Sequence, residues 1–463
     1  MINYVNESTS LQKKNKAKTA DLPLLIRLIP LISMTMILSM SVLNDWIAFV
    51  LLLLFSFIIA FSSFYAFIVF YVSLIPAQFL LILSGFTLMI PLGLILVIFF
   101  IRDLAKGRMN LIFNREVLFY LAILFMIIVS SLFASLFTQG DWLTFRSNGL
   151  VITSALLIYL KVRTVDISNL KTMMKSVFLS SFMLSFVCLY IVGIRVIHFG
   201  LPRLIVQNEN SSWLASMIAI YTFFGMPAFL KGSRTAILAV PVTIFFNMQF
   251  ILSTQSRTSW LVLLTMAMAF LVYSRYSLKK SVYFFVLFLV IVSFFAFVIL
   301  GWTVIYNRIF RSYERFGVTG LLSGRDYLTK AGLEVFKQFP ILGIGNSSLL
   351  ERQYVGDITG SYNIAHNGYV MILLRFGIIG FVVFISFCVN SVRTILHAEK
   401  YRTIFLGAMV GYLIATFSSS PFFNDFYMSI IAVILGFSSR KTGASEVQHA
   451  DYGGSTNCQE GSQ

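Results

Sequence analysis

Long apolar segments recur along almost the whole of this 463-residue chain, and they constrain its fold more than any other feature. A helix needs about 20 apolar residues to cross the hydrocarbon core of a bilayer, and many of these segments approach that length. The period-two alternation that a transmembrane β-barrel requires is absent. With 58% hydrophobic and only 11% charged residues, the chain has too little charge to cover a soluble domain of this size. The sequence therefore predicts an all-α, polytopic transmembrane helical bundle.

The apolar segments define a set of expected spans, with two alternatives near the start of the chain. Residues 24–43 form one apolar run, and residues 46–83 form either one long tilted span or two short spans that separate at Ser62-Ser63. Two crossings by 46–83 give fourteen spans, whereas twelve result if 24–43 lies in the interface and 46–74 crosses once. The remaining spans are expected at 84–101, 116–137, 147–161, 176–198, 213–230, 235–252, 259–274, 281–304, 368–390, 403–418 and 422–438.

Lysine and arginine residues are concentrated in every second connection between the expected spans. These connections hold 22 of them, whereas the alternate short connections hold three, Arg146, Arg203 and Arg257. Basic residues of short loops stay in the cytoplasm, so both termini are expected there and the number of spans is even. This distribution also accounts for the net charge of +17 without a nucleic-acid partner.

One connection, residues 305–365, is much longer than the others and falls on the outer face. Long loops in compact proteins are usually functional. Between Arg325 and Phe339, apolar residues recur at the spacing of one helical face, which predicts an amphipathic helix that lies on the membrane or caps a cavity. The chain then divides into a cytoplasmic segment (1–23), a transmembrane bundle (24–304), this outer loop (305–365), C-terminal transmembrane helices (366–438) and a disordered cytoplasmic tail (439–463).

Three places on the outer side carry side chains suited to chemistry. Arg257 opens a span against the charge bias, although an arginine there can also be an ordinary interface anchor. Arg325 can present a planar fork to a phosphate, or it can be a solvated neighbour of Asp326 at a helix start. His366 lies where the long loop re-enters the membrane. A helix N-terminus there favours the neutral imidazole, which can accept a proton as a general base, although a lone interface histidine is more often structural.

Two arginines and one histidine on the same side suggest a reaction whose leaving group is an anionic phosphate. Arginines can supply the charge stabilisation that a metal supplies elsewhere, and the outer connections hold no Asp-x-Asp pair or His/Cys cluster. We therefore expect no metal and no other cofactor. If His366 only anchors the loop, the base would have to be Glu351, Asp357 or Asp326.

These residues lie in short motifs that resemble the O-antigen ligase/polymerase superfamily. The resemblance covers about residues 205–390, and the order, spacing and common outer location of the motifs make the set specific. The motifs are Ser256-Arg257-Thr258, Gly324-Arg325 with the helix after it, Pro340-Ile-Leu-Gly-Ile-Gly345, and Ala365-His366-Asn367-Gly368-Tyr369 running into Gly377-Ile-Ile-Gly380.

The resemblance implies a GT-C-like enzyme that transfers a lipid-linked glycan outside the membrane, from an oligosaccharide on undecaprenyl diphosphate. In that family, the arginines matching Arg257 and Arg325 hold the diphosphate, and the histidine matching His366 activates an acceptor hydroxyl. The reaction inverts the anomeric centre and uses no metal. One position departs from the pattern, because Arg375 stands where members often carry an acidic residue.

Arg375 lies about nine residues into its span, where a charge is costly unless it faces a wet cavity, an anion or a partner. We expect it to line the donor cavity, with Asn367 and Tyr369 as further substrate-binding residues. The alternative for Arg375 is a structural pairing with a backbone carbonyl or a carboxylate.

The leading functional hypothesis is a polysaccharide polymerase in the bacterial cytoplasmic (inner) membrane, which joins lipid-linked repeat units into a capsule, exopolysaccharide or O-antigen chain. The first alternative is a ligase that moves finished glycan to lipid A core or to a protein. The second is a lipid-linked oligosaccharide flippase, although transporters often show repeats and paired intramembrane charges that this sequence lacks. Expected partners are the lipid-linked donor, membrane lipids, a flippase and a chain-length regulator.

Overall fold

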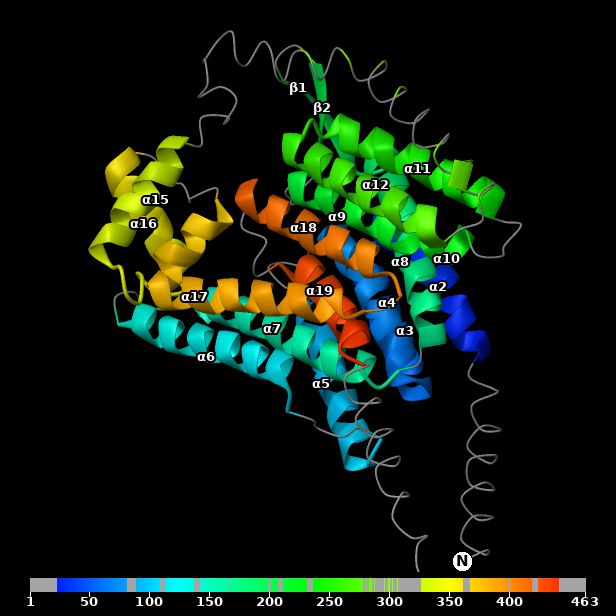
Figure 1. Cartoon of the computed structure of the whole chain (residues 1–463), viewed down its shortest axis with the longest axis horizontal. Helices are drawn as coiled ribbons and strands as arrows, with labels where there is room; N and C mark the ends of the chain where they lie inside the picture. Colours follow the sequence, from blue (N-terminus) through cyan, green and yellow to red (C-terminus); the bar gives the residue numbers. More distant parts are fainter. Residues whose placement is uncertain are drawn as a thin grey trace, which may run out of the picture.

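The chain folds into helices that run back and forth between the two ends of one bundle (Figure 1). The computed structural model describes residues 23–80, 89–108, 113–136, 142–165, 167–198, 201–206, 211–230, 236–277, 326–360, 367–398, 400–418 and 424–440, with a few isolated residues between 280 and 306. The predicted N-terminal segment, the span at 281–304, the first part of the outer loop and the tail from residue 441 thus fall wholly or largely outside the described residues.

The described helices confirm the predicted all-α polytopic bundle. Six stretches are long and apolar enough to cross a membrane, in α3, α6, α8, α9–α10, α12 and α17, and shorter apolar runs occur in five other helices. The bundle helices are α2 (Pro23–Val42), α3 (Asp45–Ser62), α4 (Phe64–Leu74), α5 (Met89–Ala105), α6 (Arg115–Ser135), α7 (Trp142–Val162), α8 (Ile167–Tyr190), α9 (Ser211–Gly225), α10 (Pro227–Leu230), α11 (Ala236–Ser253), α12 (Arg257–Ser277), α17 (Gly368–Leu396), α18 (Arg402–Ser418) and α19 (Asp425–Ser438), with a 3₁₀ turn, η1 (Ile75–Leu80), after α4.

Helix α4 lies inside the bundle, and each of its residues is buried. Its sequence is apolar on all sides, as expected of a helix that other helices surround. Helices α2, α3, α5 and α8 pack against it, while α12 packs along α18 and α7 along α19. The core is therefore continuous from the first helices to the last.

The region 46–83 contains two helices rather than one long one. Ser63 has an extended backbone, and its N–H closes α3 on Ile59 O at 2.8 Å. Its hydroxyl then accepts the N–H of Ala66 at 3.3 Å, as an N-cap of α4 does. Helices α3 and α4 contact each other, so the chain reverses at Ser63. Two helices that separate at Ser63 are one of the two alternatives for this region, and the choice between twelve and fourteen spans stays a prediction.

Two helices pack on the bundle at one end only. They are α15 (Asp326–Gln338) and α16 (Ser348–Thr359), beside the start of α17 (Figure 1). We call this end the loop end and the other the opposite end. Helix α15 confirms the predicted amphipathic helix, since Leu328, Ala331 and Val335 are buried along one face. The sequence analysis did not identify α16, although Ser347 caps it and Gly360 ends it in the left-handed conformation.

The span predicted at 176–198 was wrong after Tyr190. Helix α8 ends at Tyr190, and residues Gly193–His198 (β1) pair antiparallel with Leu201–Val206 (β2). A Cβ at position 193 would lie 2.0 Å from Cys188 O, so only glycine permits this sharp departure from the helix. Apolar residues continue through β1, and this continuity concealed the change from helix to strand.

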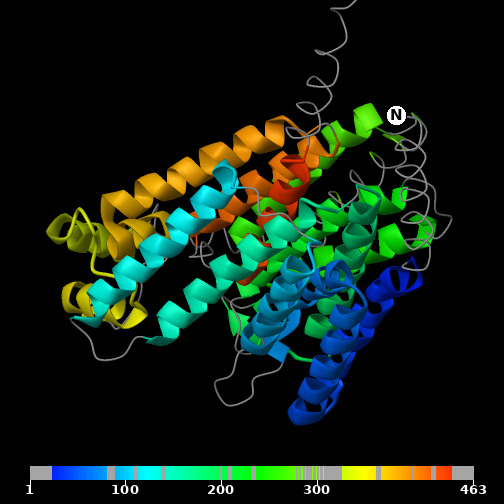
Figure 2. The ribbon, with the colours of Figure 1, turned by 90° about the horizontal axis from the view of Figure 1, so that it is seen from below.

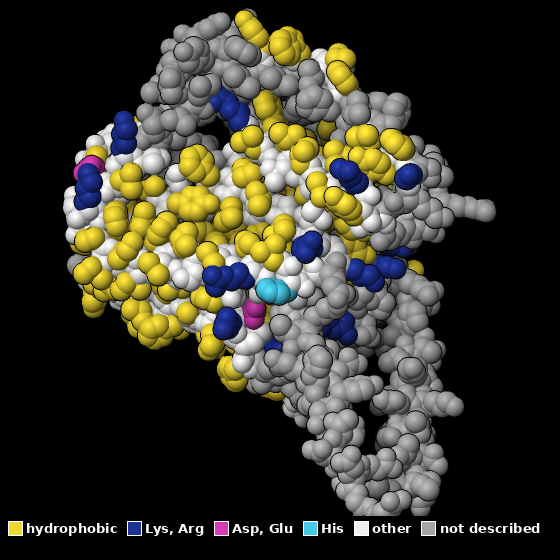
Figure 3. Space-filling model, in the orientation of Figure 1, with side chains coloured by type: hydrophobic (Ala, Val, Ile, Leu, Met, Phe, Trp, Pro, Cys, Tyr) yellow, Lys and Arg dark blue, Asp and Glu magenta, His cyan; other side chains and the backbone are white. Residues whose placement is uncertain are grey.

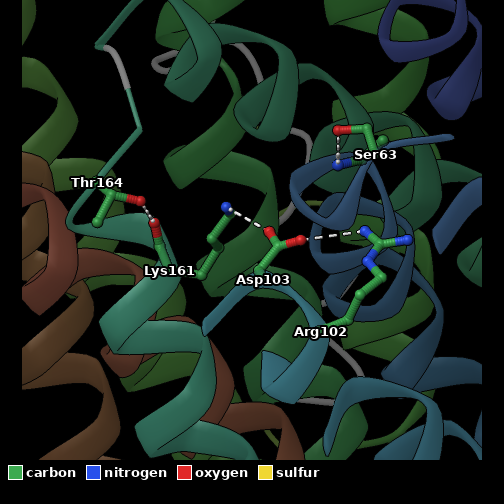
Figure 4. Close-up of polar contacts among 6 residues, drawn as sticks. Ser63, Arg102, Asp103, Lys161 and Thr164 are labelled. Carbon is green, nitrogen blue, oxygen red and sulfur yellow. Dashed lines mark hydrogen bonds and ion pairs between the residues drawn. The ribbon is translucent and has the colours of Figure 1, made fainter. Parts of the chain in front are cut away.

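The opposite end holds a cluster of charged side chains between α5 and α7 (Figure 4). Lys161 Nζ donates to Asp103 Oδ2 at 2.9 Å, and Arg102 Nη2 donates to Oδ1 at 3.1 Å. The Arg102 guanidinium lies over the Phe99 ring, and Lys161 Nζ lies over the Phe64 ring. The cluster joins the ends of two helices beside the α3–α4 turn.

The sides of the bundle are apolar between these two ends. In Figures 1 and 2, α6 and α17 lie side by side along one side of the molecule, with α15 and α16 at their common end. Figure 3 shows hydrophobic side chains across this face, while basic and acidic side chains gather toward its two ends. An apolar band between two polar ends is the surface expected of a multi-pass membrane protein.

Candidate active site

The start of α12 and the start of α17 lie at the loop end, on either side of α18. Gly407 of α18 packs against Ala269 and Gly411 against Val262, so α12 and α18 are antiparallel and α12 begins where α18 ends. From the other side, Tyr369 Oη donates to Leu413 O at 2.9 Å. The last turns of α18 therefore separate the start of α12 from the start of α17.

Arg257 is the first residue of α12 and is partly buried. A hydroxyl network fixes the backbone around it: Ser259 Oγ donates to Ser212 O at 2.9 Å and lies 3.0 Å from Ser216 Oγ, both on α9. Ser256 Oγ accepts the N–H of Ser259 at 3.3 Å, which caps the new helix. The arginine is thus held on a rigid helix start rather than on a free loop.

The start of α17 is capped by a side chain that the sequence analysis singled out. Asn367 Oδ1 accepts the N–H groups of Tyr369 and Val370, at 3.0 and 3.3 Å. Because Arg257 is the first residue of α12, its guanidinium charge lies beside the partial positive charge of that helix N-terminus, and α17 begins at the same end of the bundle. An anionic group such as a phosphate is favoured at this end of the bundle.

Helix α17 is interrupted at Gly377. Its φ of 64° and ψ of −164° lie in a region that only glycine adopts readily. A Cβ at this position would also lie 2.1 Å from Ile341 O, because the outer loop crosses the helix there. The break divides α17 into a short piece at the loop end and a longer piece that reaches the opposite end.

Residues 340–346, which we call the strap, complete the hydrogen bonding of the broken helix. Gly343 and Gly345 have φ of 69° and 98°. A Cβ at Gly343 would collide with α17 and a Cβ at Gly345 with α6, so both positions require glycine. Four hydrogen bonds join it to α17: Ile344 N to Leu374 O (2.8 Å), Gly345 N to Arg375 O (3.1 Å), Ile378 N to Pro340 O (2.9 Å) and Ile379 N to Ile341 O (3.5 Å). The two motifs Pro340–Gly345 and Gly377–Gly380 therefore form one structural unit.

Side chains tie the end of the strap to α6 and α7. Asn346 is 1% exposed, and its Oδ1 accepts a hydrogen bond from Asn148 Nδ2 at 2.8 Å. Its Nδ2 donates to Ser131 Oγ at 3.0 Å, and its backbone N–H donates to Ser130 O at 3.2 Å. The outer loop is fixed to three helices of the bundle.

Arg375 forms a buried ion pair with Glu351 of α16. Arg375 Nη2 and Nε lie 2.7 and 2.8 Å from Glu351 Oε2. The side chains are 8% and 0% exposed. A carboxylate partner is the alternative that the sequence left open for Arg375, and a role in donor binding stays a prediction. The pairing also occupies Glu351, one of the substitute bases.

The structure thus brings Arg257, Asn367, Tyr369 and Arg375 to one end of the bundle. Arg325 and His366 lie outside the described residues, but each directly precedes a described residue at that end, Asp326 and Asn367. The sequence analysis missed Asn346 and the pairing of Glu351, because neither belongs to a recognisable pattern. Among the residues that the structure describes, no three His, Cys, Asp or Glu side chains come together in the manner of a metal site.

Residues 243–385 match the family model described as O-antigen ligase. This match supports the O-antigen ligase/polymerase superfamily that the sequence motifs indicate. The matched region runs from α11 to α17 and contains Arg257, Arg325, the strap and His366. The matched family consists of glycan-processing enzymes, so the match supports an enzyme with a lipid-linked oligosaccharide substrate in a membrane setting. No curated protein and no solved structure shows significant similarity to the chain.

Proposed function

We propose that this protein is a polysaccharide polymerase of the O-antigen ligase/polymerase superfamily. It joins oligosaccharide repeat units that are carried on undecaprenyl diphosphate at the outer face of the bacterial cytoplasmic membrane. The observation that carries the proposal is the placement of Arg257 and the N-termini of α12 and α17, all within the family-matched region, at the loop end on either side of α18. This is a site for an anionic leaving group on the side where the long loop packs.

The distribution of basic residues supports the orientation. The connections at the opposite end include Arg102, Lys106, Lys161 and Arg163, and the loop end has few basic residues in its short connections. Under the positive-inside rule, the opposite end faces the cytoplasm and the loop end faces outward. The donor is then used after its glycan has reached the outer leaflet.

The proposed reaction is a displacement at the anomeric carbon. The acceptor hydroxyl oxygen forms the new glycosidic bond while the bond from that carbon to the diphosphate oxygen breaks, which inverts the centre. The acceptor proton passes to His366, and undecaprenyl diphosphate leaves with the electron pair. Arg257 and Arg325 bind the diphosphate and stabilise its growing charge, as the resemblance implies, without a metal.

A ligase is the second candidate, because the matched family model is described as O-antigen ligase. A ligase would use the same donor and the same three residues. It would differ in the acceptor, which would be lipid A core or a protein instead of another repeat unit. The two functions predict different products in a deletion strain. Single repeat units on the cell surface indicate a polymerase, whereas long chains that remain on the lipid carrier indicate a ligase.

Substitutions in the deletion strain test the proposed site. Arg257→Lys keeps the charge but loses the planar fork, so polymer formation should fall by about 30- to 1000-fold, equivalent to roughly 2–4 kcal/mol. His366→Gln should abolish transfer while donor binding remains. Lys337→Ala is the matched control, because it removes an exposed positive charge from α15 at the same end. Normal polymer from Arg257→Lys and His366→Gln proteins would exclude the proposed chemistry.

Cysteine labelling tests the orientation. In a background without Cys188, Cys388 and Cys458, Lys337→Cys and His397→Cys place single thiols at exposed positions on the loop end and the opposite end. An impermeant maleimide added to intact spheroplasts should label only position 337. Labelling of position 397 alone would reverse the orientation and overturn the proposed location of the site.

A further inference from the structure

The tip of the strap presents bulky apolar side chains outward. Ile341 is 62% exposed and Leu342 is 44% exposed, although the backbone around them is hydrogen bonded to α17. Large apolar side chains are unfavourable in water. The turn that these two residues form does not require large apolar side chains. An exposed apolar tip on an otherwise fixed segment indicates contact with something apolar.

The exposed apolar surface of α17 begins at the level of the strap tip. From Gly368 to Gly377 the residues are buried or partly buried, whereas Ile378 and Ile379, just beyond the break, are 44% and 48% exposed. Ile379 N approaches Ile341 O at 3.5 Å, so the tip of the strap directly joins this surface. The exposed stripe then continues along α17 toward the opposite end, through Val382, Ile385 and Val389.

The length of α17 places this level at the edge of the bilayer. The helix has 29 residues, more than one crossing requires, but the part from Gly377 to Leu396 has about 20, the number that one crossing needs. On α6, Ala134 packs against Gly345, and the neighbouring exposed residues Leu132 and Leu136 are apolar as well. Exposed charges appear on α15, where Lys337 pairs with Glu334.

We propose that the tip of the strap, Ile341 and Leu342, inserts into the outer leaflet of the bilayer. Its partner is the lipid itself, at the boundary between headgroups and acyl chains. Non-helical backbone can lie at this depth only if its polar groups find partners, and α17 and α6 pair with much of the strap, including the Ile341 carbonyl, which accepts from Ile379 N at 3.5 Å. The outer loop is then anchored on the bilayer as well as on the bundle, independently of the reaction that the protein catalyses.

A fluorescent probe at single cysteines measures this insertion directly. The full chain without its native cysteines, carrying Ile341→Cys, Leu342→Cys, Val382→Cys or Lys337→Cys, is labelled with an environment-sensitive dye. It is then placed in nanodiscs of phosphatidylcholine and phosphatidylglycerol. Lipid with a nitroxide near the headgroup should quench positions 341 and 342 as strongly as 382, with little loss at 337. Aqueous iodide should quench 337 and leave 341 and 342 largely unaffected.

Two results would overturn the proposal. Quenching of positions 341 and 342 by iodide but not by lipid would place the strap in water. Quenching by neither would mean that protein, for example a second copy of the chain, covers the tip. If one of these two cysteine variants folds poorly, the other still tests the proposal. Because no donor is present, the result is separate from the outcome of the polymerisation assays.

Discussion

The two ends of the bundle use charged side chains in different ways. At the loop end, Arg375 and Glu351 are both buried, and two guanidinium nitrogens converge on one carboxylate oxygen. At the opposite end, Asp103 is shared by Lys161 and Arg102, whose side chains are 13% and 21% exposed. The first cluster ties an outer loop to a helix, and the second ties the ends of two neighbouring helices.

This difference determines how each end responds to the loss of a charge. A buried charge whose partner is removed cannot be hydrated, so the surviving group carries a large desolvation penalty. Asp103 is also buried, with 4% of its side chain exposed, but it has two basic neighbours that are partly exposed to water, so one remains when the other is removed. We therefore expect the outer loop to be held in an all-or-none manner and the opposite end to tolerate substitution.

The largest expected effect comes from removing one partner of the buried pair. Arg375→Leu leaves Glu351 unpaired and should destabilise the protein by about 3–5 kcal/mol, seen as a lower unfolding midpoint in detergent and faster proteolysis of the outer loop. The double variant Arg375→Leu with Glu351→Leu should recover most of this loss. A single variant as stable as the wild type would show that the pair does not hold the loop.

A smaller loss is expected from the backbone break at the same end. Gly377→Ala strains the backbone by about 1–3 kcal/mol and pushes the added methyl into Ile341 O, so the strap should detach from α17. Gly360→Ala is the matched control, because Gly360 has a similar φ of 66° but open space around a Cβ. Protection of the strap amides from hydrogen exchange should fall in the first variant and persist in the second. Equal protection in both would contradict the role of the strap.

Removing the helix cap at either end should lower the stability of the protein by about 1 kcal/mol. Asn367→Ala removes the cap of α17 at the loop end, and Asn114→Ala removes the cap of α6 at the opposite end. The Asn114 variant should lose at least as much stability, because Asn114 Nδ2 also donates to Tyr159 Oη. Only the Asn367 variant should reduce polymer formation. A similar loss of polymer in both would mean that stability alone limits activity.

The smallest effect is expected for Lys161→Met, below about 1 kcal/mol, because Arg102 still contacts Asp103 and methionine, although it loses the cation–π contact with Phe64, keeps an unbranched apolar side chain there. Thermal unfolding of this variant and of Arg375→Leu under the same conditions compares the stability lost at the two ends. If Lys161→Met costs as much as Arg375→Leu, burial does not distinguish the two clusters.

The periodicity of the sequence predicted the helical bundle and offered a break near Ser63 as one of two alternatives, because these features depend on neighbours along the chain. The amphipathic pattern after Arg325 likewise predicted α15. The pairing of Arg375 with Glu351 could not be predicted in this way, since it depends on how the outer loop folds back across 24 residues. Helix α16 was missed because its periodicity is weaker than that of α15, and the hairpin after Tyr190 because its strands are as apolar as the preceding helix.

The break at Gly377 has a consequence for biosynthesis. The strap is made before the residues of α17 to which it bonds, so during translation it emerges with no partner for its backbone. It can close only after α17 has been made and inserted, and Arg375 reaches Glu351 at the same stage. A nascent chain halted before Gly377 should therefore expose an open, protease-sensitive outer segment, and maturation of this segment reports that the late helix has entered the bilayer.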